Sequence, residues 1–212
     1  MAKRAKRLSL SEFAAARNRL FSELAVLHSA WEQYNFLFLS GSERVKVLNV
    51  CAAWFFGMTQ RLLMREMLLG ISRLTDKAAF GPFDNLTIEG LLRDPALKGK
   101  TNLRALLGRR VRKAIRIAGP IRVHRNKYIA HLDHAVAVGN PAALLPRFPL
   151  ATIRNSLDAL EAVYNEHGRR VLGTDTAFEL NSLRAAEALF RILEQSDRWT
   201  RWKASEEANP SF

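Results

Sequence analysis

The sequence predicts an all-α protein, built as an antiparallel up-and-down bundle of long helices. Apolar residues recur every three or four positions through most of the 212 residues, which is the spacing of a helix with one buried face. Glycine and proline gather between these periodic stretches, where they end helices. Strand-like patterns are almost missing, with Ala135–Val138 as one weak candidate. Successive helices joined by short connections pack side by side, so a bundle is favoured.

Two long helices should occupy the N-terminal third of the chain. Ser9-Leu-Ser-Glu12 is a capping box, in which the Ser9 hydroxyl accepts from a first-turn amide and Glu12 reaches back. Helical spacing then continues to about residue 38, and Ser40-Gly41 ends it. A second helix is expected over residues 42–74. It is apolar on more than one side, as expected of a central helix.

The middle of the chain is more interrupted. A loop is expected over residues 75–100, with one or two helical turns at 87–92. A helix should begin near Thr101, and Gly119-Pro120 should break or kink it because proline lacks an amide donor. Helix should resume over residues 121–134.

Two further helices complete the expected bundle, and no repeat or linker divides it. One is expected over residues 150–172, and a second capping box, Thr176-Ala-Phe-Glu179, should open the last. We therefore expect a single helical domain over residues 9–203. It lies between a basic flexible N-terminus at 1–8 and a polar tail at 204–212.

The composition is that of an ordinary soluble protein, with 48% hydrophobic and 25% charged residues. No uninterrupted apolar run approaches the roughly 20 residues that span a bilayer, and no secretory signal follows the basic start. Cys51 is the only cysteine, so an internal disulfide and a cysteine-based zinc site are excluded. These observations predict a cytoplasmic protein with no cofactor and no membrane partner.

A net charge of +13 attracts phosphates through counterion release, so nucleic acid is the leading partner class. A basic composition inherited from the source proteome is the alternative. The distribution favours a site, because no acidic residue separates Asp94 from Asp133, whereas eleven lysines and arginines fall there. A solvated surface would explain many of them equally well. The candidate RNA-contact residues are Arg109, Arg110, Arg112, Lys113, Arg116, Arg122 and Lys127.

Arg125 lies on the apolar side of the helix expected over residues 121–134, where it turns toward the protein. A guanidinium keeps its charge and is costly to bury, so it needs a carboxylate, an interface or an anion. The functional interpretation is phosphate binding and stabilisation of transition-state charge. The structural alternative is a salt bridge to an acidic residue on another helix.

A neighbouring polar face carries His124, Lys127, His131 and His134. An imidazole is the natural general acid or base near neutral pH, although a lone histidine more often serves packing or solvation. Metal binding by His131 and His134 is a further alternative, without carboxylate or cysteine companions at ligand spacing. Arg125 and His131 are about 120° apart on an ideal helix, so a joint role requires a cleft that both reach.

Three short stretches carry a resemblance to a known family. Arg125-Asn126 followed by His131 resembles the signature of HEPN domains, in which an arginine and an adjacent polar residue precede a histidine. The sequence RNKYIAHLD, with SRLTD at 72–76 and NLTIEGLL at 85–92, is most similar to the abortive-infection, AbiU-like branch. The resemblance covers roughly residues 9–193 in helix order.

The resemblance implies a HEPN-like bundle, usually dimerised so that two motifs face one another across a basic cleft. It also implies metal-independent RNA cleavage in many members. Arg125 would then stabilise the scissile phosphate, Asn126 would orient the motif, and His131 would handle the proton of the 2′-hydroxyl or leaving oxygen. The products would be a 2′,3′-cyclic phosphate and a 5′-hydroxyl. A homodimer and an antitoxin protein are the further partners to expect.

The expected function is therefore an RNA-cleaving toxin or phage-defence effector. Some family members have lost activity, so an inactive module that binds RNA or a partner protein is the alternative. A purely structural interaction protein is the third hypothesis, favoured if a buried carboxylate neutralises Arg125. Asp76 and Asp133 are each a cap or an ion-pair partner in the structural interpretation.

Overall fold

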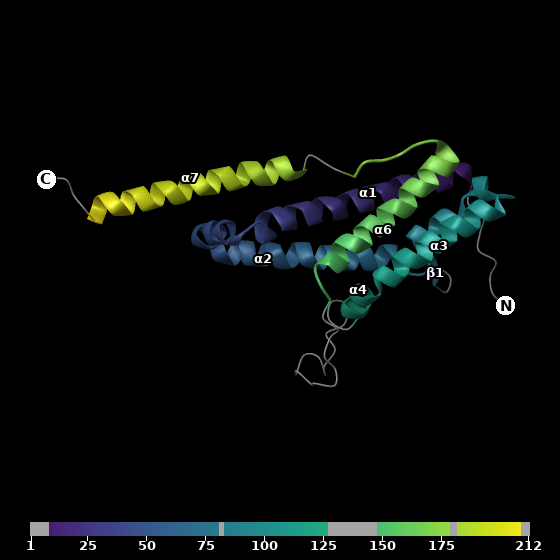
Figure 1. The fold of residues 1–212 in the computed structure, drawn as a ribbon, viewed down its shortest axis with the longest axis horizontal. Helices are drawn as coiled ribbons and strands as arrows, with labels where there is room; N and C mark the ends of the chain where they lie inside the picture. Colours follow the sequence, from purple (N-terminus) through teal and green to yellow (C-terminus); the bar gives the residue numbers. More distant parts are fainter. Residues whose placement is uncertain (1–8, 81–82, 127–147, 179–181, 209–212) are drawn as a thin grey trace, which may run out of the picture. The chain divides into compact units, whose positions relative to one another are not determined.

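The computed structural model describes residues 9–80, 83–126, 148–178 and 182–208, and these residues are predominantly helical (Figure 1). The predicted all-α class is confirmed. The contacts group the chain into two compact units. One unit comprises residues 1–28 and 66–178, and the other comprises residues 29–65 and 179–212. The single domain expected over residues 9–203 stays a prediction.

The first two helices follow the predicted boundaries. They are α1 (Leu10–Tyr34), continued by the π-helical turn η1 (Asn35–Leu39), and α2 (Ser42–Leu74). The capping box at the start of α1 is formed. The Ser9 amide donates to Glu12 Oε2 at 2.8 Å, and the Glu12 amide donates to Ser9 Oγ at 3.2 Å. Both groups would otherwise be unsatisfied at the helix end.

The middle of the chain contains a small hairpin that we expected to be irregular loop. Its two-residue strands pair antiparallel, and short 3₁₀ turns follow. The break at Gly119-Pro120 is confirmed, with Pro120 in the first turn of the new helix, where its missing amide costs nothing. The elements are β1 (Ala79–Phe80), β2 (Phe83–Asp84), η2 (Ile88–Arg93), η3 (Pro95–Leu97), α3 (Thr101–Ile117) and α4 (Gly119–His124).

The last described elements are α6 (Ala151–His167), the π-helical turn η6 (Gly168–Leu172) and α7 (Ser182–Ala208). No helix begins at Thr176, because Ala177 and Phe178 are not helical, and Glu179 of the second expected capping box lies outside the described residues. Phe178 is instead buried, and its ring contacts those of Phe21 and Tyr164. Helix α7 continues past residue 203, where we expected a polar tail to begin.

The core of the first unit lies where α3 packs against α6 and η2. Leu107 and Val111 of α3 and Leu157 and Leu160 of α6 are buried in it. Full burial of such a side chain contributes about 1.5–3 kcal/mol relative to leaving it in water. The packing fixes α3 beside α6, which matters for the arginines described below.

The second unit has a smaller core of Leu37, Leu48, Phe56 and Phe190. Helix α2 also exposes large apolar side chains, and Trp54 is 77% exposed. Among the described residues, α2 alone is long and apolar enough to cross a membrane, although core helices of soluble proteins pass the same test. Only 11% of its most apolar window is buried. The expectation of no membrane partner stays a prediction.

Candidate functional site

Asp76 follows the last turn of α2 and receives two arginines from the α4 region. Arg122 Nη2 donates to Asp76 Oδ1 at 2.9 Å, and Arg125 Nη2 donates to Asp76 Oδ2 at 2.5 Å. Each carboxylate oxygen therefore holds one guanidinium. The two arginines reach the same carboxylate because residues three apart on a helix share a face. We call these three residues the Asp76 group.

The Asp76 group keeps a positive charge and some access to solvent. Two guanidiniums and one carboxylate leave one net positive charge. The side chains of Arg122, Arg125 and Asp76 are 32%, 23% and 31% exposed. Each guanidinium has five N–H donors, and Asp76 contacts one nitrogen of each. Among the described residues, Asp76 can thus hold Arg125 in place and leaves other donors of its guanidinium available to an anion.

The three stretches that carry the family resemblance meet at this point of the fold. The Asn85 amide donates to the Ala78 carbonyl at 2.9 Å, and its side chain donates to the Lys77 carbonyl at 3.1 Å. The Ala78 amide donates to Glu89 Oε2 at 3.2 Å. The segment after Asp76 is therefore tied to the NLTIEGLL stretch, while Asp76 itself is tied to the arginines.

The structure describes two residues of the predicted catalytic set, Arg125 and Asn126, and their catalytic roles stay predictions. Arg125 is partly buried and paired with Asp76, which follows the end of another helix, so the ion pair of the structural alternative is formed. That carboxylate is neither fully buried nor exclusive to Arg125, so it does not neutralise the pair. Asn126 is exposed. Lys127, His131, Asp133 and His134 lie outside the described residues, so their roles stay predictions.

We expected His124 on a polar face of its helix, but its side chain is partly buried. Its ring meets the edge of Phe148 at 5.6 Å between centroids. Burial lowers the pKa of His124 from its ordinary value, so the neutral form is favoured. Within the described ranges, no three histidine, cysteine or carboxylate side chains are grouped as metal ligands.

Helix α3 presents a basic stripe to solvent. Arg109, Arg112, Lys113 and Arg116 are all exposed, and their spacing of three and four places them on one face. In the part of the chain that the structure describes, no carboxylate forms an ion pair with any of them. These four residues, named the α3 stripe below, belong to the predicted RNA-contact set and are exposed to solvent.

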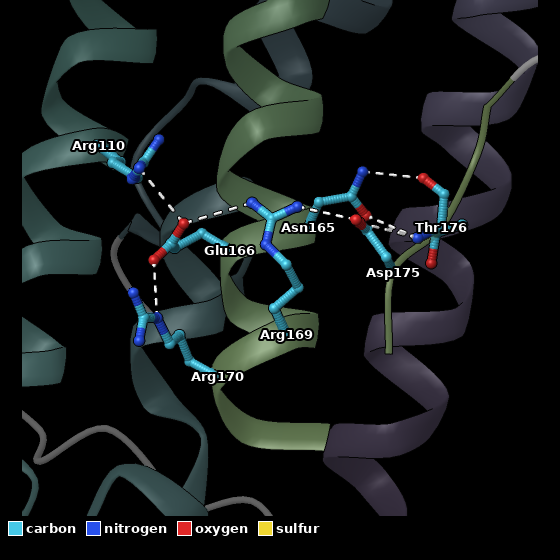
Figure 2. Close-up of polar contacts among 7 residues, drawn as sticks. All are labelled: Arg110, Asn165, Glu166, Arg169, Arg170, Asp175 and Thr176. Carbon is cyan, nitrogen blue, oxygen red and sulfur yellow. Dashed lines mark hydrogen bonds and ion pairs between the residues drawn. The ribbon is translucent and has the colours of Figure 1, made fainter. Parts of the chain in front are cut away.

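Arg110 behaves differently from the α3 stripe, because it turns toward α6 and joins a cluster around Glu166 (Figure 2). Arg110 Nη2 and Arg169 Nη2 lie 3.3 and 3.4 Å from Glu166 Oε2, and Arg170 Nε donates to Oε1 at 3.1 Å. Arg169 also donates to Asp175 at 2.9 Å. We call Arg110, Arg169, Arg170 and Glu166 the Glu166 cluster.

The Glu166 carboxylate is buried and ionised. Its side chain is 6% exposed. Burial alone would raise the pKa of Glu166, but hydrogen bonds from Arg170 and Arg169 and the charge of Arg110 outweigh it. The pKa of Glu166 therefore lies below its ordinary value. The carboxylate keeps its charge at neutral pH and acts as a fixed anchor for the arginines.

The turn after α6 is shaped to hold this cluster. Gly168 allows close approach of the returning chain, since a Cβ there would lie 2.7 Å from the Thr174 carbonyl oxygen. Gly173 has φ of +68°, the left-handed conformation that glycine adopts without strain. The Asn165 side chain then exchanges two hydrogen bonds with the backbone of Thr176 (Figure 2). Asp175 is thereby placed against Arg169.

Sequence reasoning missed Glu166, Arg169 and Arg170 as members of a charged site. The pattern EHGRR at residues 166–170 could have indicated it, because cations three and four residues after a glutamate share its helix face. The participation of Arg110 had no such local signal. It depends on the packing of α3 against α6.

The comparison with known families agrees with this all-helical fold and with the motif around Arg125. The family model described as AbiU2, a HEPN domain, matches residues 10–207, so the chain belongs to the AbiU2 family of HEPN domains. No curated protein and no solved structure matches the chain.

Proposed function

We propose that this protein is a metal-independent endoribonuclease of the toxin or phage-defence type. Membership of a HEPN family associated with abortive infection supports the proposal, as does the net charge of +13. The observation that carries it is the Asp76 group. There a guanidinium of the predicted motif is held in place by a carboxylate that a second arginine shares. Such preorganised positive charge is suited to a phosphodiester transition state.

In the proposed reaction, Arg125 contacts the non-bridging oxygens of the scissile phosphate and Asn126 orients the motif. His131 accepts the proton of the 2′-hydroxyl, whose oxygen then attacks phosphorus. The bond from phosphorus to the 5′-oxygen breaks, and that oxygen takes up a proton. The products are a 2′,3′-cyclic phosphate and a 5′-hydroxyl. No oxidation state changes, and the proposal assigns no step to a metal ion.

The proposal includes a homodimer, since one composite site can then combine an arginine and a histidine from different chains. Exposed apolar side chains on α2 support self-association, because large exposed apolar patches mark interaction surfaces. They are Val50, Trp54, Phe55, Met58 and Leu62. An antitoxin protein that masks the site belongs to the same proposal, as does a cytoplasmic location.

The direct test is cleavage of a labelled RNA by the parent protein and by Arg125→Ala and His131→Ala variants. We expect each substitution to lower kcat by at least about 100-fold, as loss of a transition-state donor or a general base does. Arg198→Ala, at an exposed position on α7, is the matched charge control and should cleave normally. The new RNA ends should be 2′,3′-cyclic phosphates, formed equally well in EDTA.

Two results would contradict the proposed mechanism. One is full activity in both motif variants, and the other is loss of parent activity on chelation. Either result would assign the cleavage to a different site or to a contaminating nuclease.

The second candidate function is an inactive HEPN module that binds RNA or a partner protein. The pairing of Arg125 with Asp76 favours it, because the carboxylate competes with a phosphate for that guanidinium. This alternative predicts salt-sensitive RNA binding without cleavage. Binding would survive His131→Ala and weaken when Arg109 or Arg112 is replaced.

A further inference from the structure

The Glu166 cluster holds more positive charge than its carboxylate and the neighbouring Asp175 neutralise. Three guanidiniums face Glu166 and Asp175, which leaves one net positive charge in the group. A single buried carboxylate needs only one cation as a partner. Three cations gathered around it repel one another, and exposed salt bridges add little to the free energy of unfolding. Stability alone therefore gives a poor account of why all three are there.

The geometry turns these arginines outward. Glu166 is 6% exposed, whereas Arg110, Arg169 and Arg170 are 42%, 47% and 62% exposed. The contacts with Glu166 and Asp175 involve one nitrogen each of Arg110 and Arg170 and two of Arg169. With five N–H donors on each guanidinium, most donors of the cluster are not taken by these carboxylates. The buried carboxylate thus fixes the guanidiniums, and each of the three arginine side chains is partly exposed to solvent.

The cluster continues the basic surface of α3. Arg110 lies three residues before Lys113 of the α3 stripe, so these two side chains are neighbours along the helix. The stripe runs from Arg109 to Arg116, about 10 Å along the helix. Guanidiniums bind phosphate through paired N–H donors, and a backbone-tracking groove for single strands combines several such contacts. A chain of phosphates is the ligand whose repeated charges match this row of cations.

We propose that Arg110, Arg169 and Arg170 form a subsite for RNA phosphates, positioned by Glu166 and continuous with the α3 stripe. The inference rests on the proposed function in taking RNA as the ligand. It adds two arginines beyond the RNA-contact residues predicted from sequence. The subsite contributes binding of the RNA strand at phosphates other than the scissile one.

The test measures binding separately from cleavage. The probe is a fluorescein-labelled, unstructured 2′-O-methyl RNA. Its length of about 16 nucleotides is the upper site size of a single-strand groove. Because it lacks the attacking 2′-hydroxyl, it cannot be cleaved, and its fluorescence anisotropy reports affinity alone. Titrations at several salt concentrations compare the parent with an Arg169→Ala/Arg170→Ala variant. The control is Arg191→Ala/Arg198→Ala, which removes the same charge from exposed positions on α7.

We expect the Arg169→Ala/Arg170→Ala variant to bind at least about tenfold more weakly than the control. The slope of log Kd against log salt concentration should be smaller by about 1.4 for this variant. Each lost phosphate contact on a single strand lowers the slope by about 0.7, and two arginines are removed. The Arg170→Ala single variant guards against a folding defect, since that side chain is 62% exposed. Its salt slope should fall by about 0.7 with an unchanged melting temperature.

The inference is overturned if both cluster variants bind like the control. It is equally overturned if they lose melting temperature while affinity and salt slope stay constant, because the cluster then serves only to fasten α3 to α6. Failure of the proposed function has a different signature. In that case the parent binds RNA and the cluster variants bind it more weakly, yet Arg125→Ala leaves cleavage unaffected.

Discussion

Two groups of arginines in this protein each gather around one carboxylate, and they are built in opposite ways. In the Asp76 group the carboxylate is 31% exposed, and the guanidinium of Arg125 is the more buried partner at 23%. In the Glu166 cluster the Glu166 side chain is buried, with 6% exposed, and the arginine side chains are 42–62% exposed. The same chemical pair therefore holds a cation inward in one place and outward in the other.

This difference suggests different roles for the two groups. A partly buried guanidinium is fixed in orientation and less screened by water, which suits stabilisation of charge that develops during a reaction. An exposed guanidinium is screened by salt and suits reversible contact with a phosphate backbone. We therefore expect changes at Asp76 to alter the chemical step and changes at Glu166 to alter binding.

The largest expected effect concerns His167, which anchors α6 next to Glu166. His167 Nε2 and Asp94 Oδ2 lie 2.8 Å apart, and the two side chains are 0% and 4% exposed. His167→Ala leaves the buried carboxylate without this partner, so we expect a loss of roughly 3 kcal/mol in the free energy of unfolding. Thermal unfolding should show a drop of roughly 10 °C.

The control for this anchor is His167→Gln, whose side-chain amide can still donate to Asp94, and it should lose less than half as much. Hydrogen exchange adds a regional readout. Protection should fall at residues 163–170 more than at 119–126. Equal loss in both regions would show that the two arginine groups are not independent.

An intermediate effect is expected from the matched substitutions Asp76→Asn and Glu166→Gln. The Asp76→Asn side chain keeps the shape but cannot hold two guanidiniums by charge. Its kcat for RNA cleavage should therefore fall about tenfold, or about 1.4 kcal/mol. The Glu166→Gln variant should keep kcat and change the affinity for RNA. Steady-state kinetics with one substrate separate kcat from KM, and the contrast between the groups is wrong if both variants lose kcat equally.

The smallest expected effect is a dependence of stability on pH. Burial lowers the pKa of His167, and its hydrogen bond with Asp94 opposes this only in part. Burial also lowers the pKa of His28 and His124. The unfolded chain then binds more protons than the folded protein below the ordinary pKa of about 6.5. The contribution of these neutral histidines to the free energy of unfolding is thus fully present above that pH and is lost as the pH falls below it.

For one strongly shifted histidine, the loss between pH 7 and pH 6 is at most about 0.7 kcal/mol. Urea unfolding midpoints at the two pH values measure it. His167→Gln should flatten the dependence, whereas a steeper fall in that variant would contradict the assignment.

Local signals in the sequence were enough to predict most helices. The box at Ser9 and Glu12 involves residues three apart, and its hydrogen bonds depend only on the helix that they begin. The break at Gly119-Pro120 follows from the covalent structure of proline. The inward side of Arg125 follows from helical periodicity, and the structure confirms that this side chain is partly buried.

The candidate site was predictable only in part, because its ion pairs join residues that are far apart in the sequence. Asp76 was recognised as a potential ion-pair partner, but nothing in its neighbourhood indicated that Arg122 and Arg125 would share it. The two arginines are 46 and 49 residues away. Such a pair forms only after α2 and α4 have packed, and packing of side chains from distant segments has no local signature.

The sequence by itself determined the helical class, the basic charge and the motif, because composition and periodicity are properties of the chain alone. Tertiary structure decided which of the available hydrogen bonds and ion pairs were made. Thr176 shows this most clearly. Its sequence matches a capping box as well as Ser9 does, yet its backbone pairs with Asn165 and nearby Phe178 is buried. Burial of an aromatic ring and satisfaction of a buried amide outweigh one local cap.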